Sequence, residues 1–231
     1  TQTRLAVTFL VGHMKNISPM YRSAASLRSW RQARSLANIV LLLTVLVTGC
    51  QSVAPVVKIG LVAPFEGRYR DIGYDVLYSA RLAVREINAA GGIGGTRVAL
   101  VALDDGGNLE YAQATARSLL VDPGVVAVVG HWLPDTTESA GALYDQNGLA
   151  FVAGGKEPFV ESDPALLSPE FVAAYEAVTP FDEAPGPYAQ SAYDAFQLLF
   201  RSFAAAQETT GQINRPSVRA ALAGIEGGEE R

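Results

Sequence analysis

The chain has 231 residues, of which 18 are basic, 23 are acidic and one is a cysteine, and 49% are hydrophobic. Six of the basic residues and none of the acidic ones lie in the first 49 positions, so the remaining 182 residues carry 12 basic against 23 acidic side chains, a net charge of −11. This acidity argues against nucleic-acid binding. A single cysteine excludes an internal disulfide, and 182 residues suit one domain with an apolar core.

The segment before the cysteine has the three parts of a secretory signal. A basic stretch with Arg22, Arg28, Arg31 and Arg34 precedes the apolar run 39–47, and Val47-Thr48-Gly49-Cys50 resembles a bacterial lipobox. The run is too short for a membrane span, which needs about 20 apolar residues. We therefore predict a signal peptide at 1–49 and lipidation of Cys50, with a short membrane anchor or a buried core helix as alternatives. Thr1 is no initiator, so we also consider 1–19 as sequence upstream of a start at Met20.

After a tether at 50–56, apolar strands and amphipathic helices alternate. Strands are predicted at 56–62, 97–103, 125–129 and 149–153. Helices are predicted between them, from Gly73 to the glycines at 91–92, around 112–120, and from a capping box formed by Asp135 and Glu138. Strands apolar on both faces between helices predict an α/β fold, a parallel Rossmann-like sheet flanked by helices.

The alternation stops after Gly155. Ser168 and Pro169 begin a helix, a longer helix covers about 187–207, and Asn214 caps a last one through Ala223, with a frayed tail at 227–231. We therefore expect few or no strands from this part of the chain.

Several stretches resemble branched-chain amino-acid (Leu/Ile/Val)-binding proteins of ABC transporters, which have the type I periplasmic-binding fold. They are, in order, KIGLVAPFEG, SARLAVREINAAGGIGG, VALVALDDGGN, VVAVVGH and GLAFVAGG, followed by LLSPEFVAAYEAV, APGPYAQSAYDAFQLLFRSF and SVRAALAGIEG. The resemblance implies two α/β lobes that close on a ligand. Two such lobes need more than 182 residues, so we predict a single lobe over 57–231, with an excision join near 155–168.

Ligands of open parallel sheets bind outside the carboxyl ends of the strands, which predicts a half-site in the loops 64–72, 131–137 and 154–157. The candidate ligand-binding residues are Tyr69, Trp132, Asp135, Thr136, Gly155 and Glu157. The alternative for Asp135 and Thr136 is helix capping, and for the two aromatic residues an exposed interface. The loops differ from the family's pattern, with Pro134 where a serine is usual, Glu157 where a threonine is usual and Ile72 where an aromatic residue is usual.

Nothing in the sequence predicts catalysis, a cofactor or a metal. The glycines at 91–95 follow a helix and precede a strand, the reverse of a phosphate-binding loop, and are interpreted as a turn. Asp104-Asp105 is interpreted as loop solvation and capping rather than a cation site, and His131 as a hydrogen-bonding loop residue.

The sequence thus predicts a non-enzymatic, lipid-anchored, extracytoplasmic solute-binding protein of an ABC uptake system. Its expected partners are a small ligand such as an amino acid, an ABC permease and the membrane. The alternatives are an interaction lipoprotein without a ligand and a nonfunctional product of an internally deleted gene.

Overall fold

The computed structural model describes residues 54–229, and Cys50 and the predicted signal lie outside them. In chain order the elements are β1 (Val56–Ala63), α2 (Arg70–Ala89), β2 (Arg97–Asp104), α3 (Leu109–Val121), β3 (Val125–Gly130), α4 (Pro134–Gln146), β4 (Ala150–Ala153), α5 (Pro169–Glu176), α6 (Ala189–Thr210) and α7 (Arg215–Glu229). Short 3-10 turns at Gly67–Tyr69 and Pro164–Leu166 precede α2 and α5. None of these helices is long and apolar enough to span a bilayer.

The four strands form one parallel sheet in the order β2-β1-β3-β4. β1 pairs with β2 from Val56 opposite Arg97 to Ala63 opposite Asp104. Every residue of β3 is buried, as expected for a central strand with helices on both sides. The α/β fold class predicted from the sequence is confirmed, and so are all four strands, each within one residue of its expected ends.

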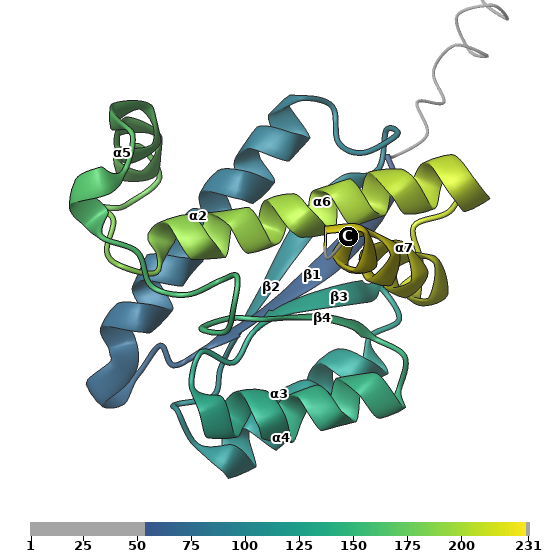
Figure 1. Ribbon diagram of the computed structural model, residues 1–231, viewed down its shortest axis with the longest axis horizontal. Helices are drawn as coiled ribbons and strands as arrows, with labels where there is room; N and C mark the ends of the chain where they lie inside the picture. Colours follow the sequence, from purple (N-terminus) through teal and green to yellow (C-terminus); the bar gives the residue numbers. More distant parts are fainter. Residues whose placement is uncertain (1–53, 230–231) are drawn as a thin grey trace, which may run out of the picture. The chain divides into compact units, whose positions relative to one another are not determined.

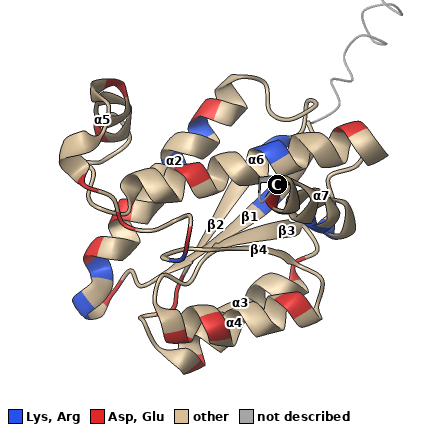
Figure 2. Cartoon of the chain, in the orientation of Figure 1, with Lys and Arg blue, Asp and Glu red and all other residues tan. Residues whose placement is uncertain are grey.

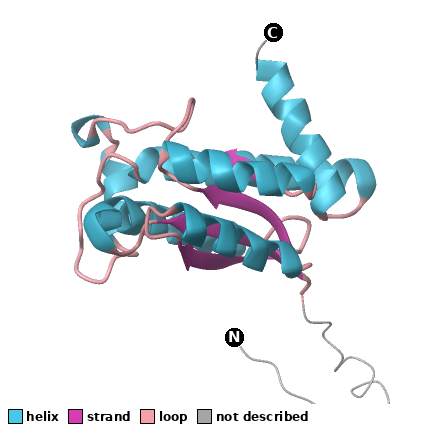
Figure 3. Ribbon diagram, turned by 90° about the horizontal axis from the view of Figure 1, so that it is seen from below, coloured by secondary structure: helices cyan, strands magenta, loops and turns pink. Residues whose placement is uncertain are grey.

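Helices cover both faces of the sheet (Figures 1 and 3). α3 and α4 lie on one face, over a core cluster that includes Val62, Leu119 and Tyr144. α2, α6 and α7 cover the other face, over a larger cluster that includes Ile59 and Phe196. Figure 2 shows acidic positions on α3 and α4, in keeping with the acidic composition of residues 50–231.

Several predicted helix ends differ from the structure; α6, for example, covers Ala189–Thr210 rather than about 187–207. α2 begins at Arg70 rather than Gly73. Gly73 lies inside the helix at a close contact, since a Cβ there would lie 2.3 Å from the carbonyl oxygen of Pro64. α7 continues to Glu229, so the tail predicted to be frayed from Gly227 is helical that far. Ile225 packs against the core and so extends the buried stripe of α7 by one turn.

The segment after β4 forms no strand within the described residues, as predicted. Ser168 caps α5 by accepting a hydrogen bond from the Phe171 N–H, 3.1 Å away, and Asn214 caps α7 by accepting one from the Ser217 N–H at 3.0 Å. The predicted glycine turn is also confirmed, with positive φ at Gly91, Gly92, Gly94 and Gly95.

A buried carboxylate fixes this last segment to the sheet domain. Asp75 on α2 is 6% exposed and accepts hydrogen bonds from the N–H groups of Gly186 (2.9 Å) and Tyr188 (2.7 Å) and from the Tyr175 hydroxyl (3.0 Å). Three points of the chain about 100 residues away therefore meet at one side chain. Burial raises the pKa of Asp75, and the hydrogen bonds from Gly186, Tyr188 and Tyr175 oppose that rise.

Candidate functional site at the carboxyl ends of the strands

The connections of β1 and β3 leave the sheet toward opposite faces. β1 and β3 are neighbours, but the helix that follows β1 packs on one face and the helix that follows β3 packs on the other (Figures 1 and 3). This topological switch point is where open α/β sheets hold ligands. We call the loops beyond the carboxyl ends of β1, β3 and β4, residues 64–72, 131–137 and 154–157, the switch-point edge.

His131 closes the end of β3 and is completely buried. Its backbone has a positive φ of 49°, and its N–H donates to the Val62 carbonyl at 2.9 Å. The ring nitrogens lie 3.0 Å from Asp105 Oδ2 and 3.0 Å from the Tyr144 hydroxyl. A neutral imidazole satisfies both contacts, with Nδ1–H donating to the carboxylate and Nε2 accepting from the tyrosine.

This Asp105–His131–Tyr144 cluster joins the ends of β2 and β3 to α4. Both Asp105 and His131 are 0% exposed, so neither can reach a substrate. Burial raises the pKa of Tyr144, and the nearby charge of Asp105 acts in the same direction, so the phenol stays protonated as a donor. The hydrogen-bonding role predicted for His131 is confirmed. The capping role predicted for Asp104-Asp105 is confirmed, since Asp104 accepts from the N–H groups of Phe65 and Gly106 and Asp105 accepts from the Gly107 N–H at 2.9 Å. The predicted solvation of Asp105 is wrong, because its side chain is completely buried.

Trp132 belongs to the core. It is 4% exposed, and its ring centre lies 6.0 Å from that of Tyr188 in an edge-to-face arrangement. A Cβ on Gly154 would lie 2.5 Å from the indole, so the glycine at the end of β4 is what admits the ring. The indole N–H is buried without a hydrogen-bond partner. The alternative that Trp132 forms an exposed interface is therefore wrong.

The turn before α4 differs from the predicted capping box. The N-cap residue is Leu133, and it makes no side-chain cap; Pro134 and Asp135 are the first helical residues. Thr136 is 2% exposed and its hydroxyl donates to the Leu133 carbonyl at 3.0 Å, while Asp135 is exposed. Asp135 still favours the helix, because a carboxylate in the first turn complements the helix dipole.

The other predicted site residues lie around this turn. Gly155 has φ of 71°, its N–H donates to the Phe159 carbonyl, and a Cβ on it would be 2.7 Å from the Trp132 carbonyl oxygen. Tyr69 is half-buried beside Gly107 and carries the Arg68 guanidinium 4.4 Å from its ring centre. Glu157 is exposed and faces a separate cavity toward α6.

The structure thus brings Trp132 and Gly155 together at the ends of β3 and β4, and surrounds them with core packing. The sequence did not predict the hydrogen bonds of Asp75 and Tyr144. Its helical periodicity indicates which face of a helix each residue lies on, but not which distant residue it contacts. No group of three or more His, Cys, Asp or Glu side chains among residues 54–229 is arranged to hold a metal ion.

Comparison with known proteins agrees with this geometry. The family model described as "Periplasmic binding protein" matches residues 56–167. An "Amino acid binding protein" of Pseudomonas aeruginosa is 35% identical over 99 residues, which are 43% of this chain and 26% of that protein. The "Leu/Ile/Val-binding protein" of Escherichia coli K12 is 29% identical over 137 residues, 58% of this chain and 34% of that protein. The chain thus spans about a quarter to a third of the length of these curated relatives.

Solved structures share the fold. The branched-chain amino-acid transporter substrate-binding protein LivJ of Streptococcus pneumoniae, in complex with isoleucine, superposes with a TM-score of 0.60 at 16% identity, covering 73% of this chain and 88% of that one. The leucine-binding protein LivK of Thermotoga maritima gives 0.56 at 12% identity, covering 72% and 87%. The resemblance to branched-chain amino-acid-binding proteins is confirmed.

Proposed function

We propose that this chain, whose residues 56–167 match the periplasmic binding protein family, is an extracytoplasmic solute-binding lipoprotein that serves an ABC uptake system and takes an amino acid as its ligand. One observation carries the proposal: the family match falls on the segment that builds the order β2-β1-β3-β4 and its switch-point edge. Its role would be capture of a solute for an ABC permease rather than chemistry.

We further propose that the chain has one lobe where the family resemblance implies two. Residues 54–229 contain one four-stranded sheet, and the chain passes from β4 through 155–168 to α5 without entering a second. A ligand on a single lobe lacks the enclosure that normally buries most of a small ligand's surface. The expected contacts are with Tyr69, Trp132, Asp135, Thr136, Gly155 and Glu157.

Calorimetry with leucine tests the single-lobe proposal. We expect binding to be millimolar or weaker, because half of the enclosing surface is missing. Micromolar affinity for leucine would show that a second enclosing surface is present and would overturn the proposal.

The proposed anchor is tested by replacing Cys50. In cells that process lipoproteins, the wild-type chain should incorporate labelled fatty acid and sediment with membranes, and Cys50→Ser should do neither, because the thiol is the acylated group. Ser52→Ala is the matched control and should behave as wild type. Equal labelling of Cys50→Ser would refute lipidation at this residue.

An interaction lipoprotein is the second candidate, and one observation favours it. Leu166 and Phe181, both in the connection between β4 and α6, are each 83% exposed. Exposed apolar side chains of this size can mark a docking surface. A stable homodimer in light scattering that dissociates in Phe181→Ser would support this function over solute capture.

A further inference from the structure

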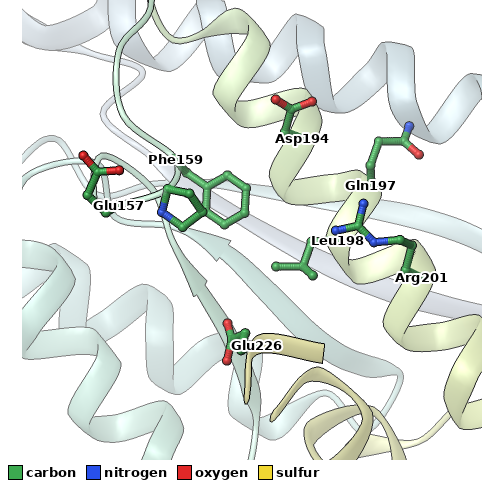
Figure 4. A pocket seen from close by; sticks show the side chains of 8 residues that line it. Glu157, Phe159, Asp194, Gln197, Leu198, Arg201 and Glu226 are labelled. Carbon is green, nitrogen blue, oxygen red and sulfur yellow. The ribbon is translucent and has the colours of Figure 1, made fainter. Parts of the chain in front are cut away.

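A cavity of about 360 Å³ lies between the first turns of α2 and the chain that leads into α6. Asp71 and Glu183 line it from these two segments, and both are exposed. Asp75 is a third carboxylate in the lining, and no Lys, Arg or His is among the described residues that border the space. The larger cavity that Glu157 faces is different, because Arg201 lines it beside carboxylates and already interacts with another group of the chain (Figure 4).

Tyrosine rings form the walls of the smaller cavity, which we call the tyrosine cavity. Tyr74 and Tyr78 come from α2, Tyr175 from α5 and Tyr188 from the start of α6. The ring centre of Tyr78 lies 6.1 Å from that of Tyr74 and 6.1 Å from that of Tyr175. Tyr78 and Tyr175 are 5% and 2% exposed, so the core behind them fixes their positions. Aromatic rings beside carboxylates attract cations, because the ring faces are negative.

The hydroxyl of Tyr78 is a polar group that the fold leaves unused. Within residues 54–229 it has no hydrogen-bond partner, yet the completely buried side-chain atoms without a partner in that part of the chain are Ser79 Oγ and Trp132 Nε1. The Tyr78 hydroxyl is therefore not sealed in the core. Burial raises the pKa of Tyr78, and the negative charge of Glu183 adds to that rise, so the carboxylate lies near this hydroxyl. A hydrogen-bond donor in the cavity can reach both groups.

Two of these rings already attract guanidinium groups of the chain. The Arg70 guanidinium lies 5.3 Å from the Tyr74 ring centre, and the Arg81 guanidinium lies 5.7 Å from that of Tyr78. Both arginines are exposed and neither lines the cavity, so they contact the rings from outside it. A cation inside the cavity meets only negative charge in the lining, whereas the carboxylate of an amino acid would be repelled there.

We propose that the tyrosine cavity binds an organic cation that donates hydrogen bonds, a guanidinium or primary ammonium group on a short alkyl chain. The cation donates to the carboxylates of Asp71 and Glu183 and to the Tyr78 hydroxyl, and its alkyl chain packs on the tyrosine rings. The same group can belong to a free small molecule or to an arginine or lysine side chain of a partner protein. The inference is independent of leucine capture and of the lipid anchor.

The test is an NMR titration of the full chain with n-butylguanidinium, followed at the amide signals of residues 71–78 and 183–188. N-Butylurea has nearly the same shape and no charge, so it should bind at least about tenfold more weakly. Tetramethylammonium, a cation without hydrogen-bond donors, should also bind more weakly. No shift at these amides, or equal affinity for n-butylguanidinium and either of the other probes, would overturn the inference.

A peptide separates the two sources of the cation. Acetyl-Gly-Arg-Gly-amide presents the guanidinium group as a side chain between peptide bonds. Binding of this peptide as tight as that of n-butylguanidinium would support the site as a contact for a partner protein. Binding of n-butylguanidinium alone would support it as a site for a free solute.

Variants identify the groups involved. Glu183→Gln should weaken binding of n-butylguanidinium by about tenfold and leave that of N-butylurea unchanged, because it removes a charge and keeps the side-chain shape. Glu170→Gln removes the same charge from an exposed position on α5 outside the cavity, and as the matched control it should bind as wild type. Tyr78→Phe should weaken n-butylguanidinium but not tetramethylammonium, which has no proton to donate. Equal affinity of Glu183→Gln and wild type for n-butylguanidinium would refute the site.

Failure of this inference and failure of the proposed function are distinguishable. The tyrosine cavity meets the switch-point edge only at Asp71 and Ile72. Shifts caused by n-butylguanidinium but confined to 131–137 and 154–157 would place the cation at the switch-point edge and reject the tyrosine cavity. Leucine binding and fatty-acid labelling bear on the proposed function alone.

Discussion

The Asp75 carboxylate should determine how firmly the segment after residue 168 is attached to the sheet domain. Replacing Asp75 with Ala leaves the N–H groups of Gly186 and Tyr188 without their acceptor. It also removes the shorter of two contacts of the Tyr175 hydroxyl, which keeps the Asp75 backbone carbonyl at 3.3 Å. Each buried donor without a partner costs about 1–3 kcal/mol, and water can reach some of them in the variant. We therefore expect Asp75→Ala to lower the free energy of unfolding by about 3–5 kcal/mol.

Asp75→Asn separates the hydrogen bonds from the side-chain volume. Its amide keeps one oxygen acceptor but places an NH₂ group against one of the backbone donors, so the expected loss is about 1–3 kcal/mol. Urea unfolding measures both values, and an unchanged slope with a lower midpoint would show that stability alone has changed. Asp71→Asn is the matched control: Asp71 is an exposed aspartate in the first turn of the same helix, and its replacement should cost less than about 0.5 kcal/mol. A loss below about 1 kcal/mol in Asp75→Ala would refute the role given to this carboxylate.

Three further predictions follow from buried polar groups and close packing. Because burial raises the pKa of Asp75, protonation of this carboxyl group favours the folded state. The difference in unfolding free energy between wild type and the non-titrating Asp75→Asn should therefore be largest at acidic pH and shrink as pH rises through the native pKa. Urea unfolding at several pH values measures this difference, and a difference that grows with pH would contradict the expected sign. Arg215 donates hydrogen bonds to the backbone carbonyls of Leu119, Leu120, Asp122 and Val125. Arg215→Met should therefore lower the free energy of unfolding by about 2 kcal/mol, and Arg215→Lys should lower it by less. Equal stability of Arg215→Met and wild type in thermal unfolding would show that these carbonyls need no such donor. Gly154→Ala should cost about 1–3 kcal/mol by forcing a methyl against the Trp132 indole, and Trp132→Phe in the same chain should recover part of that loss; additive losses would mean that the two residues do not compete for space.

The sheet and its helices were predictable from the sequence because their signals are local. Continuous apolar runs such as Val125–Val129 occur where both faces of a strand are covered, and β3 is buried at every position. Ser168 and Asn214 were recognised as caps because a cap is defined within four residues of the chain. The strand order was also constrained, since right-handed crossovers leave few arrangements for four parallel strands.

The contents of the switch-point edge were not predictable in the same way. Asp105 and His131 are 26 residues apart, and His131 and Tyr144 are 13 apart, so no periodic pattern reveals that they meet. The Asp135 box failed because Pro134 takes the first helical position and moves the N-cap to Leu133. Asp75 was hidden among the polar residues of α2, since its partners lie 100 to 113 residues later in the chain.

Trp132 connects this packing to the proposed function. The second residue after β3 could have extended toward a ligand, but its indole lies over Gly154 and against Tyr188, and so covers the ends of β3 and β4 with the chain's own aromatic rings. An amino acid bound over the ends of β3 and β4 has to pack on this covered surface, which is a further reason to expect weak capture at the switch-point edge. In a chain with Trp30 replaced by Phe, Trp132 is the only tryptophan, and its emission should be blue-shifted and insensitive to leucine. A red shift on adding leucine would show that the ring leaves its place to admit the ligand, and would make the switch-point edge the principal site.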